Sequence, residues 1–188
     1  LARRIAGILE VPCKFIAFET PGALADTAAE DLWDIGNIAH EPDRAQLIDF
    51  TQPYVLIDAH FLVHASSTLT NNHEIDQKGL RIAAFDRSAY DLWLKNNLKH
   101  ARLVAASSIQ HSHELFLRGE VDVLASLKPR IQKEMDTDHH RMIEPRFTAI
   151  KQAVGIKKTN PAVLQFLDDL IANAIQDGFI AASLAAHG

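Results

Sequence analysis

The chain has 188 residues, of which 47% are hydrophobic and 23% are charged, which is the composition of a globular protein and not of a disordered segment. Its net charge of −5, without any run of basic residues, argues against a nucleic-acid partner. No apolar run approaches the roughly 18 residues that a membrane-spanning helix requires. We therefore expect one large domain or two small lobes that do not themselves cross a membrane.

The amino-terminal segment predicts a helix, a strand and a second helix in turn. Residues 1–9 carry an apolar helical face, residues 13–18 are rich in β-forming side chains, and residues 21–30 favour a helix of small residues. The single cysteine, Cys13, lies in the apolar strand and is expected to be buried and inert. Because Leu1 already falls inside a helical pattern, we expect a signal peptide and a first strand to precede it.

The stretch WDIGNIAHEPDRAQLIDFTQPY, residues 33–54, is the one around which the chain is organised. Its apolar beginning predicts a buried parallel strand, and Pro42 and Asp43 favour a short helix directly after it. Arg44 would then stand at the carboxyl end of the strand, where open α/β sheets bind ligands. A guanidinium offers a planar fork of donors to a carboxylate. The alternative is a solvated Arg on a surface helix.

A second strand-to-helix junction follows further along the chain. Residues 55–65 and 80–85 predict strands, and Ser88 is the expected N-cap of the next helix, with Asp91 completing a capping box. We expect free backbone N–H groups at residues 86–89, which would suit a carboxylate. An ordinary capped helix that binds nothing is the alternative.

The remaining elements continue the alternation of strands and helices. Residues 101–106 predict a strand, Ser107 and Gln110 a capped helix that stops at Gly119, and residues 121–125 another strand. A strand of paired character follows at residues 146–158.

The next helix has a clear 3.6-residue period; it is expected to start at Asn160-Pro161 and to end at Gly178, before a final short helix. Alternating helices and strands indicate the α/β class. The chain is expected to leave its first lobe near residues 62–66 and to return near residues 145–148, which is the geometry of a hinge.

The ten histidines do not form a recognisable metal site. The closest spacings are His111-x-His113 and His139-His140, and neither is accompanied by a cysteine pair or an HExxH pattern, so we expect these rings to be solvated. The sequence also lacks a P-loop, a GxSxG and a GxGxxG motif. We therefore expect neither a metal nor a cofactor, and no catalytic residue stands out.

Three segments together carry a family resemblance. Residues 41–54, EPDRAQLIDFTQPY, resemble the pattern (T/D)-P-x-R-A followed by D-F-(S/T)-x-P-Y, with Glu41 at the Thr or Asp place; residues 115–123 resemble L-x-x-G-x-V-D-A-V; and residues 86–93 match a strand, G-(S/T), helix junction. The chain thus resembles the extracytoplasmic solute-binding proteins of amino-acid ABC importers, bacterial solute-binding protein family 3.

The resemblance implies the two-lobed type II periplasmic-binding fold, with two hinge crossings, a ligand cleft between the lobes, and an α/β architecture throughout. Residues 1–64 plus 146–188 would form lobe 1, and residues 65–145 would form lobe 2. Arg44 would grip the α-carboxylate of the ligand. The full set of expected ligand-binding residues is Asn37, Ala39, Arg44, Asp86, Ser88, Ala89 and Ser126.

One departure from the family pattern concerns the amine end of the ligand. The Asp that usually pairs the amine would fall at Ser126 or Leu127, so that partner is missing, and Asp86 or an acidic residue upstream of Leu1 could substitute for it.

The implied function is to bind a small carboxylate-bearing solute, amino-acid-like or another organic acid, in the periplasm and to deliver it to an ABC permease. Two alternatives remain open. One is a cyclohexadienyl or prephenate dehydratase-like enzyme that uses a carboxylic acid as general acid. The other is a ligand-sensing domain of a receptor.

Overall fold

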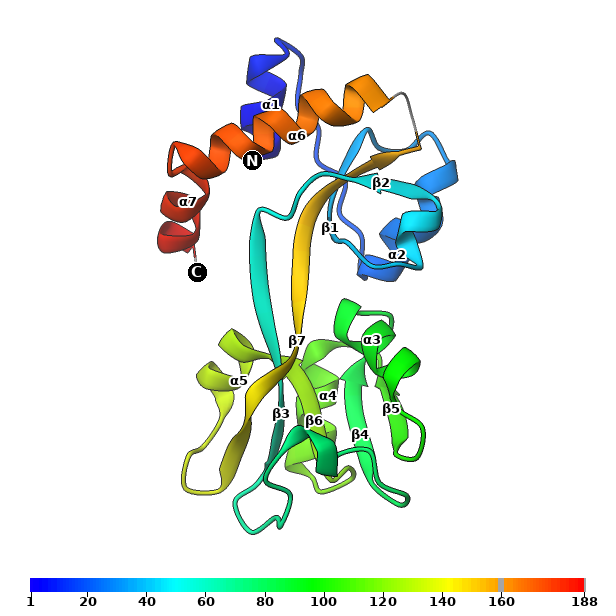
Figure 1. Ribbon diagram of the computed structural model, residues 1–188, viewed down its shortest axis with the longest axis vertical. Helices are drawn as coiled ribbons and strands as arrows, with labels where there is room; N and C mark the ends of the chain where they lie inside the picture. The colour runs from blue at the N-terminus through cyan, green and yellow to red at the C-terminus, as the bar shows by residue number, and fades with distance from the viewer. Residues whose placement is uncertain (159–160, 188) are drawn as a thin grey trace. The chain divides into compact units, whose positions relative to one another are not determined.

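The computed structural model describes residues 1–158 and 161–187, and the chain divides into two compact units (Figure 1). Unit 1 consists of Leu1–Leu56 and Lys151–Gly188, and unit 2 consists of Ile57–Ile150. Each unit combines helices with strands, so the expected α/β class is confirmed. The lobe limits expected from the sequence, 64/65 and 145/146, differ from these limits, which fall inside two long strands, Val55–His64 and His140–Lys157.

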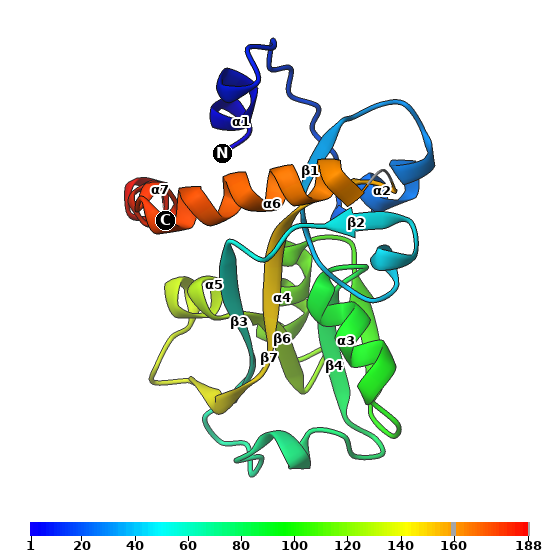
Figure 2. The same ribbon diagram turned by 45° about the horizontal axis from the view of Figure 1, so that its top comes forward.

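Unit 1 contains four helices, two 3₁₀ turns and a small sheet among its described residues. Its elements are α1 (Ala2–Ile8), α2 (Pro21–Asp26), η1 (Thr27–Ala29), β1 (Ile35–Ala39), η2 (Arg44–Gln46), β2 (Ile48–Phe50), the second half of β7 (His140–Lys157), α6 (Pro161–Gln176) and α7 (Phe179–His187). Gly178, in the left-handed region at φ 81°, separates α6 from α7 as expected. Figure 2 shows α6 and α7 as two separate helices. The expected start of α6 at Asn160 lies outside the described residues.

The sheet of unit 1 is antiparallel. Both β1 and β2 pair with β7, with Ile38 opposite Ala153 and Asp49 opposite Ile156. The parallel strand expected at the start of residues 33–54 is therefore wrong in direction, because β7 runs back past β1. A Cβ atom on Gly155 would lie 2.8 Å from Ile48 Cγ2, so the close approach of β2 to β7 requires glycine there.

The strand expected at residues 13–18 is also wrong. This segment has no strand pairing, and Cys13 is exposed where a buried thiol was expected. The Phe15 side chain is 61% exposed, and the Arg3 guanidinium lies 5.2 Å from its ring centroid. A β propensity measures how well a side chain fits a pleated, half-buried surface, and this segment has no strand neighbour in the described part of the chain.

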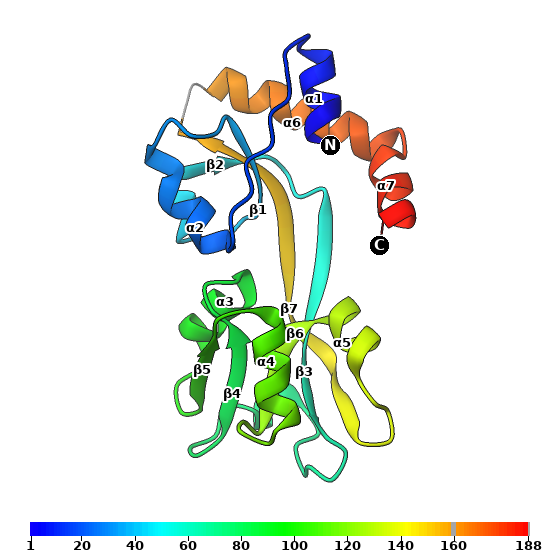
Figure 3. The same cartoon turned by 180° about the vertical axis from the view of Figure 1, so that it is seen from behind.

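Two apolar clusters hold unit 1 together. Ile5 of α1 packs with Leu167 and Ile171 of α6 and with Val154 of β7, and α1 lies beside α6 in both the front and the back views (Figures 1 and 3). The second cluster is built around Trp33, whose indole N–H donates to the Thr27 hydroxyl at 2.9 Å. These contacts fix the strands from which the candidate site projects.

Unit 2 is a mixed sheet with helices. Its elements are β3 (Val55–His64), η3 (Asn72–Glu74), β4 (Arg81–Phe85), α3 (Ala89–Asn97), β5 (Arg102–Ala106), α4 (Ile109–Leu117), β6 (Val123–Leu127), α5 (Lys128–Glu134) and the first half of β7. The strand order is β3-β6-β4-β5, with β7 beside β3. Strand β4 is parallel to β5 and β6, whereas β3 is antiparallel to β6.

Two boundaries in unit 2 differ from expectation. The N-cap of α4 is Ser108, whose hydroxyl accepts from the His111 N–H at 2.9 Å, where Ser107 was expected. Strand β6 extends to Leu127, because its pairing with β3 continues that far, so Ser126 lies inside the strand and not after it. The stop of α4 at Gly119, with φ 69°, is confirmed.

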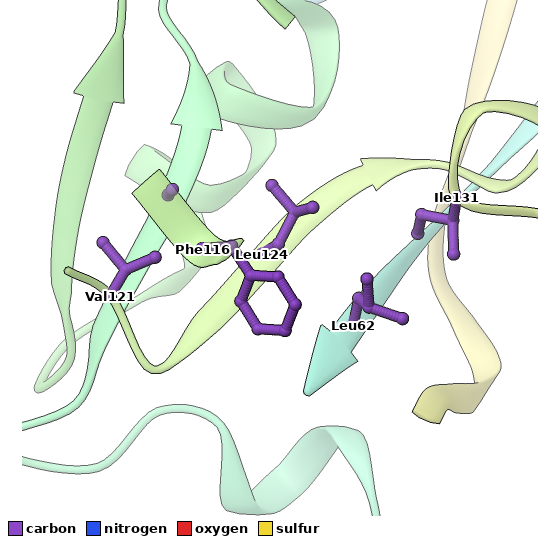
Figure 4. Packing of buried hydrophobic residues seen from close by; sticks show 6 residues of the cluster. Leu62, Phe116, Val121, Leu124 and Ile131 are labelled. Carbon is purple, nitrogen blue, oxygen red and sulfur yellow. The ribbon is translucent and has the colours of Figure 1, made fainter. Parts of the chain in front are cut away.

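Phe116 lies at the centre of the unit 2 core. It is fully buried against Leu62 of β3, Leu124 of β6 and Ile131 of α5, and Figure 4 shows these side chains gathered around one another. Seen from behind, α4 covers β4 and β6 (Figure 3). The helix therefore brings one face to the sheet and leaves Leu117, the next residue, 59% exposed.

Replacing Phe116 by Ala is expected to lower the free energy of unfolding by about 3–5 kcal/mol, because a large buried ring leaves a cavity. Leu117→Ala on the same helix should cost less than about 1 kcal/mol, since its side chain is mostly in water. Urea unfolding of both variants measures the difference. Equal losses for the two would show that the α4 face is wrongly assigned.

Candidate functional site

Arg44 is held at the end of β1 by the backbone around it. After Ala39 the ladder continues for one residue, since the His40 N–H donates to the Lys151 carbonyl at 2.9 Å. The Ala45 N–H then bonds the Glu41 carbonyl at 2.9 Å, and the 3₁₀ turn η2 begins at Arg44. The turn thus places the Arg44 side chain directly after the strand, as the sequence indicated.

The Arg44 side chain is buried. Its residue is only 5% exposed, and its Nη1 donates to the Ala39 carbonyl oxygen at 3.0 Å. A solvated surface Arg is therefore excluded. Of the other expected unit 1 residues, Ala39 is brought into contact with Arg44, whereas Asn37 lies two residues earlier on β1 with an exposed side chain.

Glu41 is a partly buried carboxyl group near the charges of Arg44 and Lys151. Burial raises the pKa of Glu41, and the positive charges of Arg44 and Lys151 oppose the shift. A carboxyl group with a raised pKa beside a guanidinium takes up a proton more readily than a solvated one.

The junction between β4 and α3 is the expected site in unit 2. Ser88 is the N-cap, as predicted, and its hydroxyl accepts from the Asp91 N–H at 3.2 Å. The Asp91 carboxylate accepts from the Arg87 N–H at 2.8 Å. Arg87 has φ 56°, the left-handed region that favours glycine, and it stands where the family pattern has glycine.

The prediction of free N–H groups at residues 86–89 is largely wrong. The Asp86 N–H donates to the Ala106 carbonyl at 2.9 Å, and the Ser88 N–H donates to the Phe85 carbonyl at 3.2 Å. The Arg87 N–H donates to the Asp91 carboxylate. Within the described residues, the N–H groups of Ala89 and Tyr90 have no acceptor. The donors at this helix start are therefore one residue further along than expected.

Asp86 is occupied by an ion pair. Its carboxylate lies 3.0 Å from Lys95 Nζ, which also lies 2.7 Å from the Asp91 carboxylate. A solute amine at Asp86 would have to compete with this lysine.

Ser126 belongs to a hydrogen-bonded chain inside unit 2. Its hydroxyl lies 3.0 Å from His113 Nε2, and His113 Nδ1 lies 2.7 Å from the Glu134 carboxylate. Ser126 is fully buried and His113 is 4% exposed, so the expectation that His113 is solvated is wrong. The sequence did contain a signal, because His113 stands three residues before Phe116 and thus on the core-facing side of α4.

His140 is the second buried ring that was expected to be solvated, and it is 9% exposed. Burial lowers the pKa of His140, and the neighbouring His64, 5.5 Å away between ring centroids, lowers it further. Burial also lowers the pKa of His113, although the Glu134 charge opposes the shift. Both rings therefore favour the neutral form.

The described residues contain no cluster of three or more His, Cys, Asp or Glu side chains that could hold a metal ion. Within the same part of the chain, no helix has the length and apolar character needed to cross a membrane.

Comparison with known families matches residues 1–187 to the bacterial extracellular solute-binding proteins, family 3. The chain belongs to this family. A search among curated proteins found no match. Membership of this family confirms the resemblance inferred from the sequence motifs.

Several solved structures are similar to this family 3 protein. A binding component of an ABC transporter from Wolinella succinogenes, complexed with lysine, has a TM-score of 0.80 at 18% identity, with 96% of this chain and 80% of that chain covered. An ancestral amino acid-binding protein that is a precursor of cyclohexadienyl dehydratase has a TM-score of 0.78 at 17% identity, with coverage of 96% and 80%.

The GluR0 ligand-binding core from Nostoc punctiforme, in complex with L-glutamate, has a TM-score of 0.79 at 14% identity, with coverage of 96% and 84%. At these identities the likeness shows the fold, and it is the type II periplasmic-binding fold expected from the sequence.

The buried histidines predict that the protein loses stability on mild acidification. Because the folded-state pKa values of His113 and His140 are lowered, the unfolded chain binds protons first, so stability is complete above the unfolded pKa of about 6.5 and falls as the pH drops below it. Each group contributes a slope of at most about 1.4 kcal/mol per pH unit. Urea unfolding between pH 7.5 and 5 measures the slope.

His113→Gln should flatten this slope, and His100→Gln, at an exposed position, should leave it unchanged. A stability that stays constant or rises from pH 7.5 to 5 would contradict the assignment of neutral buried rings.

Proposed function

We propose that this protein binds a small carboxylate-bearing solute outside the cytoplasm and delivers it to an ABC permease. The observation that carries the proposal is the buried Arg44 guanidinium at the end of β1, in a chain of the extracellular solute-binding family. A guanidinium stays charged at any relevant pH and matches a carboxylate with two parallel hydrogen bonds.

Ala39 and Asn37 accompany Arg44 in this role. The Ala39 carbonyl accepts from the Arg44 guanidinium and so holds its plane, and Asn37 lies two residues earlier on β1. Residues i and i+2 of a strand face the same side, so the amide of Asn37 shares that side with Ala39.

Unit 2 has its own group of expected ligand-binding residues. The unsatisfied N–H groups of Ala89 and Tyr90 at the start of α3 suit an anionic group, and Ser88 fixes their direction by capping the helix. We assign Asp86 and Ser126 to the same site as acceptors.

An amino acid is the solute class that the relatives support best. The Wolinella succinogenes protein is complexed with lysine and the Nostoc punctiforme core with L-glutamate. We infer the periplasmic location and the permease partner from the family, whose members are extracellular solute-binding proteins.

A dehydratase is the second candidate, and Glu41 is the observation that favours it. Its pKa is raised by burial beside Arg44, which is the state required of a general acid, and one similar structure is a precursor of cyclohexadienyl dehydratase. Incubation of the protein with prephenate decides the question. Turnover that disappears in Glu41→Gln would establish the enzyme, and absence of turnover would leave binding as the function.

Arg44→Ala is expected to weaken solute binding by about 2–5 kcal/mol, because one partner of a buried charge pair is lost. This corresponds to roughly thirty-fold to several-thousand-fold in Kd. Arg44→Lys should recover only part of the loss, since an ammonium keeps the charge without the two-pronged geometry. Calorimetric titration with the amino acid that gives the largest shift in a thermal-shift screen measures these effects.

Arg118→Ala serves as the matched control, because that side chain is 65% exposed on unit 2. An unchanged Kd for Arg44→Ala, in protein that melts as a folded domain, would show that Arg44 does not bind the solute.

A further inference from the structure

One carboxyl group of unit 1 lies in the same turn as the guanidinium to which the solute is proposed to bind. Glu41 directly follows His40, and its carbonyl oxygen accepts the Ala45 N–H at 2.9 Å. That hydrogen bond closes the turn in which Arg44 lies. The Glu41 side chain is half-buried, and Arg44 is 5% exposed. The two charges therefore share a corner from which water is partly excluded.

The charges that act on Glu41 come from its own turn and from β7. Arg44 and Asp43 lie in the turn, and Lys151 lies on β7, where its carbonyl accepts the His40 N–H at 2.9 Å. Burial is the largest effect and raises the pKa of Glu41; the charges of Arg44 and Lys151 oppose it, and the Asp43 charge adds to it. All of these effects act through space, without a hydrogen bond to the carboxyl group.

Two further titratable groups lie near this turn. Burial lowers the pKa of His40, and the Lys151 charge lowers it further, so the ring favours its neutral form. Asp49 belongs to β2, the strand that packs against the turn, and its carboxylate lies 2.8 Å from Lys158 Nζ. The negative charge of Asp49 is thus offset by its own lysine, whereas that of Glu41 is directed at the solute-binding corner.

A solute carboxylate bound at Arg44 brings a second negative charge to this turn. Two carboxylates near one guanidinium repel each other, and protonation of one of them removes the repulsion. The solute keeps its charge, because an α-carboxyl group loses its proton more readily than a glutamate side chain does. The proton therefore goes to Glu41, which burial already disposes to accept it.

We propose that Glu41 regulates the Arg44 site by taking up a proton when a solute carboxylate binds there. The inference rests on the proposed function and adds its regulation. Because the bound state holds more protons than the free state, the affinity rises as the pH falls through the range in which Glu41 titrates. Burial raises the pKa of Glu41 above its ordinary value, so this range lies above pH 4.5.

Calorimetric titration of the unaltered protein with L-lysine and with L-glutamate tests the coupling. Each titration is repeated at pH 7.5, 6 and 5 in buffers of different ionisation enthalpy, because the buffer supplies the proton and its enthalpy adds to the measured heat. We expect uptake of a fraction of one proton per bound amino acid. The Kd should decrease about two- to five-fold from pH 7.5 to pH 5, the size of a partly solvated charge interaction.

Glu41→Gln removes the titratable group and keeps the length of the side chain. At pH 7.5 this variant should bind the amino acid about two- to five-fold more tightly than the unaltered protein does, because the repulsion is gone, and its Kd should not change with pH. His40→Gln controls for the neighbouring ring, and Glu30→Gln, at an exposed position, controls for net charge. Both controls should keep the pH dependence of the unaltered protein.

The outcomes separate this inference from the proposed function. Amino-acid binding without proton uptake at all three pH values overturns the role of Glu41 and leaves the proposed function standing. A pH dependence that survives in Glu41→Gln, or that disappears in His40→Gln, also overturns it. Absence of binding by both amino acids counts against both proposals. If Glu41→Gln does not fold, the proton uptake of His40→Gln decides.

Discussion

The structure of the candidate site depends on keeping one guanidinium out of water. Arg44 is buried at the end of β1, and the desolvation of a cation must be offset by acceptors or by negative charge. The Ala39 carbonyl is one such acceptor, and its position follows from the ladder between β1 and β7. Gly155 allows β2 to approach that ladder, so a backbone constraint on β7 supports the turn that carries the charge. A bound carboxylate would add the negative charge that favours the buried state.

Unit 2 contains polar side chains in its apolar interior, where they need hydrogen-bond partners. Ser126, His113 and Glu134 satisfy one another in sequence across β6, α4 and α5, and the chain ends at a partly exposed carboxylate. The same interior leaves the Tyr90 hydroxyl and His60 Nε2 without partners. A buried polar group without a partner costs free energy, so each of these two atoms calls for an explanation.

Much of the architecture could be predicted from local patterns. The N-cap at Ser88, the helix stop at Gly119 and the position of Arg44 all depend on short-range chemistry that the sequence displays directly. The predictions that were wrong concern features that depend on residues far away in the sequence. The strand expected at residues 13–18 has no neighbour to pair with, and His113 is buried by α5 and β6, which composition alone does not reveal.

A crystal structure with the bound solute tests the central claim most directly. The account predicts both carboxylate oxygens of the solute within about 2.7–2.9 Å of the Arg44 guanidinium nitrogens, in the parallel two-bond arrangement. A solute whose carboxylate lies elsewhere, with Arg44 contacting only protein atoms, would contradict it.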